Sequence, residues 1–263
     1  MRQTLPLIAL ARLTLAFTAP AWAQDDTAAD AAVADEEVEV VVEEEEAVHS
    51  FSATMTGVSD YVFRGISQTQ EDPTFQASVD YAHISGFYAG IWGSGVDFTP
   101  EDTLPEDEDD ADVEIDYYVG FGSDFNDTFG YDVSFVYYTY PGTADGVDYD
   151  YPELIGKLTG WGWLTFTLGY SWDEFNSGET GIYYNLGGEW ALPAEFTANA
   201  GIGYFDLDDV LGDSYVDWTV GVSRSIGFVD LSFGYFDTNN DGEALYGPLA
   251  DDRWVLTASI TID

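Results

Sequence analysis

The chain has 263 residues and no cysteine, so neither disulfides nor cysteine-ligated metals can hold its fold. Its 50 acidic residues against 6 Lys and Arg give a formal net charge of −44, which argues against nucleic acid or anionic lipid headgroups as partners, because phosphate binding needs basic side chains. The charge instead favours cations as the attracted species, with solubility or a high-salt habitat as the alternative explanation.

Residues 1–23 have the features of a cleaved signal peptide. Arg2 provides a basic start, an apolar stretch runs from residue 5 to 17 with Arg12 inside it, and Ala21-Trp22-Ala23 matches the small-x-small cleavage pattern. The apolar stretch is shorter than the roughly twenty residues that a transmembrane helix needs. We therefore expect the mature chain to be exported and to begin at residue 24.

Residues 24–49 form an acidic segment that contains 11 acids and no Lys or Arg. Such a self-repelling composition predicts a disordered tail, which export would place in the periplasm. A calcium-rich or partner-binding arm is the alternative interpretation.

From residue 51 onward the apolar pattern has a period of two, as where Val113, Ile115 and Tyr117 alternate with Glu114 and Asp116. This pattern predicts strands with one apolar and one polar face. Twelve segments can be marked, at residues 51–66, 74–84, 87–98, 112–122, 129–140, 149–159, 162–172, 180–190, 195–205, 214–225, 228–237 and 252–262.

The apolar faces carry aromatic residues toward their ends, as at Phe129 and Tyr137, which suits the interfacial girdle of a membrane barrel better than a soluble sandwich. The connections also alternate between short and long, which is the layout of outer-membrane barrels. We therefore predict an all-β protein: a single transmembrane antiparallel β-barrel of about 12 strands over residues 50–263. Both termini are expected in the periplasm, and the protein is expected to be a monomer in the outer membrane of a Gram-negative bacterium.

Several segments resemble the TorF-type family of outer-membrane porins. They are GVSDYVFRGISQT (57–69), EIDYYVGF (114–121), VYYTYPG (136–142), YDYPELIGKL (149–158) and YVDWTVGVS (215–223). Their order and spacing cover residues 51–263. The resemblance implies a barrel, export to the outer membrane and a porin role, and it carries no catalytic residues. The chain departs from the barrel pattern at its last residue, Asp263, where barrels commonly have an aromatic residue.

Strand parity places one set of charged side chains on the inner, pore-lining face of the barrel. The set is Asp60, Arg64, Asp80, Glu114, Asp116, Asp132, Glu153, Lys157, Asp217 and Arg253. Acidic rings favour cations in a narrow channel, so we predict a porin for passive diffusion of small solutes with a preference for cations. Inward-facing glycines such as Gly120, Gly203 and Gly221 favour an open interior.

Arg64 is the most distinctive base of this set. Inside an acidic interior we expect it to form a structural salt bridge with neighbouring acids such as Asp60 or Asp80, and a role in a selectivity filter is the competing interpretation. Its neighbours Tyr61 and Phe63 are expected to face lipid.

An acidic loop follows the third strand. Weak cation attraction is expected at Glu106, Asp107, Glu108, Asp109 and Asp110. Calcium is a possible ligand because it takes oxygen donors, although the spacing does not match an EF-hand, and a solvated surface loop is the simpler interpretation. We predict no cofactor and no dedicated metal site.

Enzymatic activity is not expected. The two histidines, His49 and His83, are poorly placed for a Ser–His triad, and GxSxG, HExxH and phosphate-loop motifs are absent from the sequence. Two other functions stay open: a non-conducting structural or adhesive barrel and, more remotely, an outer-membrane hydrolase. A non-conducting barrel would have an interior filled by side chains.

Overall fold

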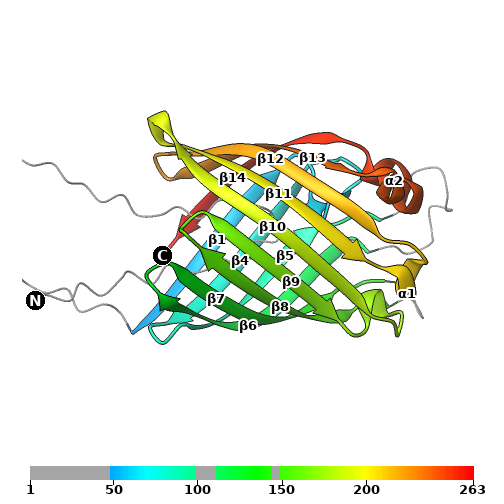
Figure 1. The fold of residues 1–263 in the computed structure, drawn as a ribbon, viewed down its shortest axis with the longest axis horizontal. Coiled ribbons are helices and arrows are strands. Elements are labelled where there is room, and N and C mark those ends of the chain that lie inside the picture. The colour runs from blue at the N-terminus through cyan, green and yellow to red at the C-terminus, as the bar shows by residue number, and fades with distance from the viewer. Residues whose placement is uncertain (1–47, 99–110, 144–147) are drawn as a thin grey trace, which may run out of the picture.

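A computed structural model of the chain describes residues 48–98, 111–143 and 148–263. In this part of the chain twelve antiparallel strands form a closed barrel (Figure 1). The strands are β1 (His49–Val58), β4 (Thr74–His83), β5 (Phe87–Gly95), β6 (Val113–Asn126), β7 (Phe129–Thr139), β8 (Tyr151–Gly160), β9 (Leu164–Ser171), β10 (Gly181–Leu192), β11 (Phe196–Asp206), β12 (Tyr215–Ile226), β13 (Val229–Thr238) and β14 (Arg253–Ile262). Pairing of β1 with β14 closes the ring, so the predicted antiparallel barrel of about twelve strands is confirmed.

Alternation along each strand separates an apolar outer face from a more polar inner face. In β7 the side chains of Phe129, Val133 and Phe135 are exposed, whereas Asp132 and Ser134 between them are buried. Because side chains in a closed sheet point alternately outward and inward, the exposed apolar rows form a belt around the barrel. Such a belt is the lipid-facing surface of a transmembrane barrel.

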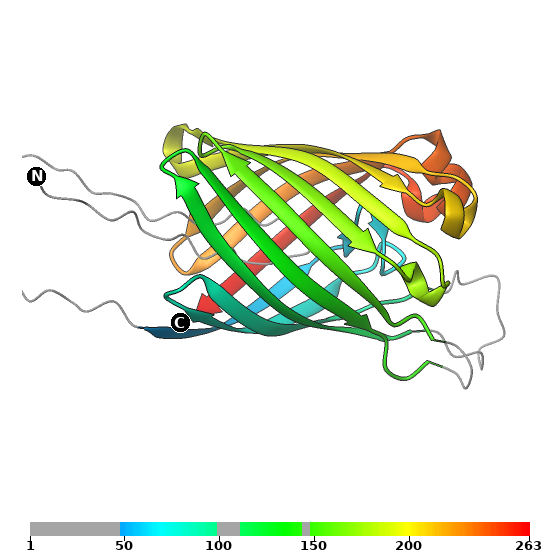
Figure 2. The same cartoon turned by 60° about the horizontal axis from the view of Figure 1, so that its bottom comes forward.

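The two ends of the barrel differ in their connections. One end, here called the turn end, carries the short turns, the start of β1 and the end of β14 (Figure 1). The other, here called the loop end, carries the long connections with η1 (Glu174–Asn176), α1 (Asp208–Leu211), α2 (Asn240–Tyr246) and η3 (Gly247–Ala250), and η2 (Pro193–Glu195) lies in a turn (Figure 2). No helix among the described residues is long and apolar enough to cross a membrane.

The first predicted strand is shorter than expected, because β1 ends at Val58 and the chain then turns into the barrel. There it forms a small hairpin of β2 (Val62–Phe63) and β3 (Ile66–Ser67). The connecting residues Arg64 and Gly65 both have positive φ, at 50° and 84°, as a two-residue type I′ turn requires. We call residues 60–69 the inward hairpin.

The expectation that Tyr61 and Phe63 face lipid is wrong. Tyr61 is 1% exposed and its ring meets Trp92 of β5 at a centroid distance of 5.4 Å, and Phe63 meets Tyr138 of β7 at 6.1 Å. Both residues were assigned to the wrong face because side chains alternate between the two faces of a sheet only within a strand. Beyond Val58 the chain leaves the barrel wall.

Aromatic side chains fill much of the interior toward the loop end. One buried cluster includes Tyr61, Trp92, Tyr118, Tyr138 and Tyr151, and a second contains Ile66, Tyr183, Phe205, Leu207, Tyr215 and Ala250. Residues of α2 and η3, namely Leu245, Tyr246 and Leu249, pack against the second cluster. The inward hairpin thus lies within an apolar core inside the barrel.

Candidate functional site

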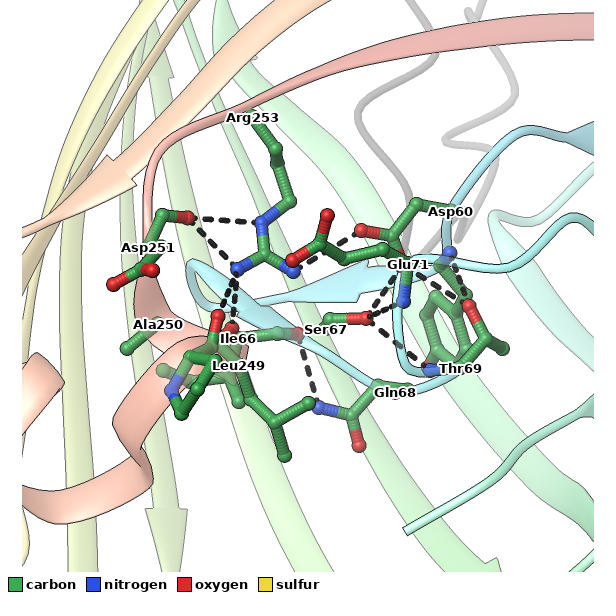
Figure 3. A network of polar contacts seen from close by, with 12 residues as sticks. Asp60, Ile66, Ser67, Gln68, Thr69, Glu71, Leu249, Ala250, Asp251 and Arg253 are labelled. Carbon is green, nitrogen blue, oxygen red and sulfur yellow. Dashed lines mark hydrogen bonds and ion pairs between the residues drawn. The ribbon is translucent and has the colours of Figure 1, made fainter. Parts of the chain in front are cut away.

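The base of the inward hairpin is tied to the last strand by a buried ion pair (Figure 3). Arg253, the first residue of β14, donates from Nη1 to Asp60 Oδ2 at 3.1 Å. Its Nε and Nη2 donate to the backbone oxygens of three nearby residues, Pro248, Leu249 and Asp251. Asp60 also accepts hydrogen bonds from the hydroxyls of Ser67 at 2.6 Å and Thr69 at 3.0 Å. Both charged groups are therefore almost fully satisfied within the protein.

The tip of the inward hairpin places Arg64 against the opposite wall. Its Nη2 forms an ion pair with Glu153 of β8, and both side chains are buried. Its guanidinium carbon lies 4.4 Å from the ring centroid of Tyr183 and 4.3 Å from that of Phe205, which are cation–π distances. The hydroxyl of Tyr215 donates to the Arg64 backbone oxygen at 2.9 Å.

The expected partners of Arg64 were Asp60 or Asp80, and this expectation is wrong. Asp60 is paired with Arg253, and Arg64 reaches Glu153 instead. The reason is the inward turn after Val58, which carries Arg64 away from its own strand and across the interior. Glu153 belongs to a distant strand, so the residues near Arg64 in the sequence gave no indication of this partner.

A second carboxyl group, Glu174 in η1, lies close enough to Arg64 for their charges to interact. Its side chain is fully buried, and neither carboxyl oxygen has a hydrogen-bond partner among the described residues. Burial raises the pKa of Glu174 to about 8, an effect that the positive charge of Arg64 opposes. At neutral pH this carboxyl group is therefore largely protonated.

Three inner-wall carboxylates are held by tyrosines that lie flat over glycines. Tyr88 of β5 covers Gly120 of β6, where a β-carbon would collide with the ring, and its hydroxyl donates to Asp132 of β7 at 3.0 Å. Gly120 and Tyr88 face each other directly in the β5–β6 register. The missing side chain of the glycine thus lets the tyrosine span one strand and reach the next.

The same arrangement recurs twice. Tyr118 of β6 covers Gly90 of β5 and donates to Asp80 of β4, and Tyr183 of β10 covers Gly203 and donates to Asp217 of β12. These inward glycines were expected to leave an opening, and this expectation is wrong at Gly120 and Gly203, because tyrosine rings occupy the space. At Gly221 the side-chain oxygen of Asn199 lies close to where a β-carbon would stand.

The remaining predicted site residues also point inward. Glu114 of β6 is 3.4 Å from the hydroxyl of Tyr140, and the fully buried Asp116 lies two residues further on the same face. Lys157 of β8 is the cross-strand neighbour of Asp132. All ten charged residues of the predicted set therefore lie on the interior side of the barrel.

Sequence analysis missed the residues that contact these charged groups or lie close to Arg64. They are Tyr88, Tyr118, Tyr138, Tyr183, Phe205, Tyr215 and Glu174. Several of the glycines were predicted to face inward, but their pairing with tyrosines depends on strand register, which the sequence alone leaves open. Glu174 fell in a predicted loop and gave no signal.

The acidic loop residues Glu106, Asp107, Glu108, Asp109 and Asp110 lie outside the described residues. Within the described ranges, no group of three or more His, Asp or Glu side chains is arranged to hold a metal ion.

Three solved structures share the fold. The KdgM porin has a TM-score of 0.50 at 9% identity, covering 81% of this chain and 99% of its own. The NanC porin has the same TM-score and identity, covering 81% and 100%, and an outer-membrane channel from Pseudomonas putida F1 has a TM-score of 0.50 at 9% identity, covering 86% and 99%. At this identity the likeness concerns the fold, which is that of an outer-membrane barrel.

Comparison with known sequences identifies the family of this chain. No curated protein sequence matches this chain. The resemblance to the TorF-type porin family is not confirmed, because the family whose model matches this chain carries a different description. The model of the Gcw_chp family, described as a bacterial protein of unknown function, matches residues 43–261, and the chain belongs to this family.

Proposed function

We propose that this protein is a porin of the Gram-negative outer membrane that lets small solutes diffuse passively and prefers cations, with the inward hairpin as its constriction. The observation that carries the proposal is an apolar outer belt around an interior rich in carboxylates. Its partners would be outer-membrane lipid and small solutes or cations, and we expect a monomer that binds no nucleic acid.

The predicted pore-lining set contains seven acids and three bases. Two of the acids, Asp60 and Glu153, are neutralised by Arg253 and Arg64. Lys157 is the one base of the set left for the other five acids, so the set keeps an excess of negative charge. In a narrow channel this charge is weakly screened and raises the local concentration of cations.

A reversal-potential measurement across planar bilayers in a salt gradient tests this proposal. The full-length mature protein should carry a current with cation preference. Changing Asp116, Asp132 and Asp217 together to Asn should reduce that preference, whereas Asp127→Asn in an exposed turn serves as the matched control. Unchanged selectivity in the triple variant would show that these carboxylates do not line the conduction path.

The alternative is a non-conducting barrel, which the aromatic filling near the loop end favours. A bilayer that stays sealed with inserted protein would support this alternative. We expect no enzymatic activity, and a hydrolase stays the remote third candidate.

A further inference from the structure

We propose that the cage around Arg64 is a binding site for guanidinium-bearing solutes, and that Arg64 occupies it as a tethered analogue of the solute. The cage consists of Tyr183, Phe205, Glu153 and Glu174. The inference rests on the proposed channel function for its biological meaning, because it names the class of solute that would pass the inward hairpin.

The cage is built to recognise a planar cation. Tyr183 and Phe205 place their rings at 4.4 and 4.3 Å from the guanidinium carbon, and Glu153 supplies the ion pair. A guanidinium group is planar, so it stacks on aromatic faces and forms directed hydrogen bonds with carboxylates. An ammonium group is a compact point charge and does both less well. The surroundings of Arg64 therefore select for this group.

The barrel wall supplies three members of the cage, Glu174 comes from η1 at the loop end, and the hairpin supplies only the cation and the ring of Phe63. Tyr183, Phe205 and Glu153 belong to β10, β11 and β8, whose backbones are fixed by pairing on both sides. Tyr183 is further held by its hydrogen bonds to Asp217. The site should therefore persist when the Arg64 side chain is removed or displaced.

Two groups in the site are left without partners by the tethered arginine. Arg64 Nη1 and both carboxyl oxygens of Glu174 are buried and form no hydrogen bond with the described residues. A buried polar group without a partner is costly, so an arrangement that pairs both would be favoured. A free guanidinium solute is not restricted by the hairpin backbone and can orient toward Glu153 and Glu174 together.

The test uses the full-length mature protein in detergent and ethylguanidinium as the probe. Arg64→Ala should bind ethylguanidinium saturably by isothermal titration calorimetry, at least about tenfold more tightly than the wild type, in which Arg64 competes. Phe205→Leu added to Arg64→Ala should weaken binding by about thirtyfold, the size expected for a desolvated cation–π contact. Arg253→Ala is the control, since Asp60 offers a carboxylate without the ring cage.

If Arg64→Ala folds poorly, its refolding yield provides a second measurement. Its refolding yield should then rise with millimolar ethylguanidinium chloride and not with equal potassium chloride. Absence of both saturable binding and folding rescue would overturn the cage, as would binding that Phe205→Leu leaves unchanged. A conducting channel that does not bind ethylguanidinium would retain the porin proposal and refute the cage. Binding without conductance would retain the cage and refute the porin proposal.

Discussion

Replacing Arg253 with alanine is expected to lower the free energy of unfolding by about 3–5 kcal/mol, the usual cost of removing one partner of a buried ion pair. The structure explains why the loss should be this large. Both side chains of the Asp60–Arg253 pair are about 5% exposed, so water cannot replace the lost partner. The substitution also removes the donors to three backbone oxygens in η3 and in the connection that leads from it to β14.

Substitution of the carboxylate partner should also be costly. Asp60→Asn keeps an oxygen that can accept from Ser67 and Thr69, but its amide nitrogen then faces Arg253 Nη1, so the buried guanidinium loses both its acceptor and its counter-charge. The double variant with Arg253→Ala should therefore be less destabilised than the sum of the single variants, with a coupling energy of about 0.5–3 kcal/mol.

Equilibrium unfolding in urea, followed by tryptophan fluorescence after refolding into lipid vesicles, measures these differences. Arg224→Ala is the matched control, because the Arg224–Glu195 pair is solvent-exposed at 3.3 Å and should contribute about 1 kcal/mol at most. The reasoning is refuted if Arg253→Ala destabilises the protein no more than Arg224→Ala does.

Two other substitutions test the interior packing. Gly90→Ala should displace Tyr118, break its hydrogen bond to Asp80 and lower the free energy of unfolding by about 1–3 kcal/mol. In a Tyr118→Ser background the same change should cost much less. Equal costs in both backgrounds would contradict the proposed packing. Burial raises the pKa of Glu174 from 4.5 to about 8, so the folded protein keeps a proton that the unfolded chain releases, and stability should fall as pH rises from about 4.5 to 8. Unfolding curves of Glu174→Gln over this range should show a shallower fall, and an identical slope would exclude this contribution.

The sequence predicted the barrel because its main signal is local. Alternation of two residues, as in Val113 to Tyr117, reports which side of a sheet each residue faces, and this holds for strands paired on both sides. The signal failed after Val58, where the same alternation continues into a hairpin that leaves the wall. Local pattern cannot reveal that change of direction.

The partners within the interior were not predictable for a different reason. Arg64 and Glu153 are 89 positions apart, and their contact depends on the path of the inward hairpin through the barrel. The tyrosine–glycine pairs depend on register between strands, as for Tyr88 and Gly120. Sequence analysis therefore identified inward charges but not the groups that neutralise them.

The ion pair between Asp60 and Arg253 joins residues 193 positions apart, one just after the first strand and one at the start of the last. During synthesis the aspartate is made long before the arginine exists. The pair can form only once the final strand is in place, so it couples the base of the hairpin to completion of the ring. An assembly intermediate that lacks its last strand would hold an unneutralised carboxylate in its interior, which distinguishes unfinished barrels from finished ones.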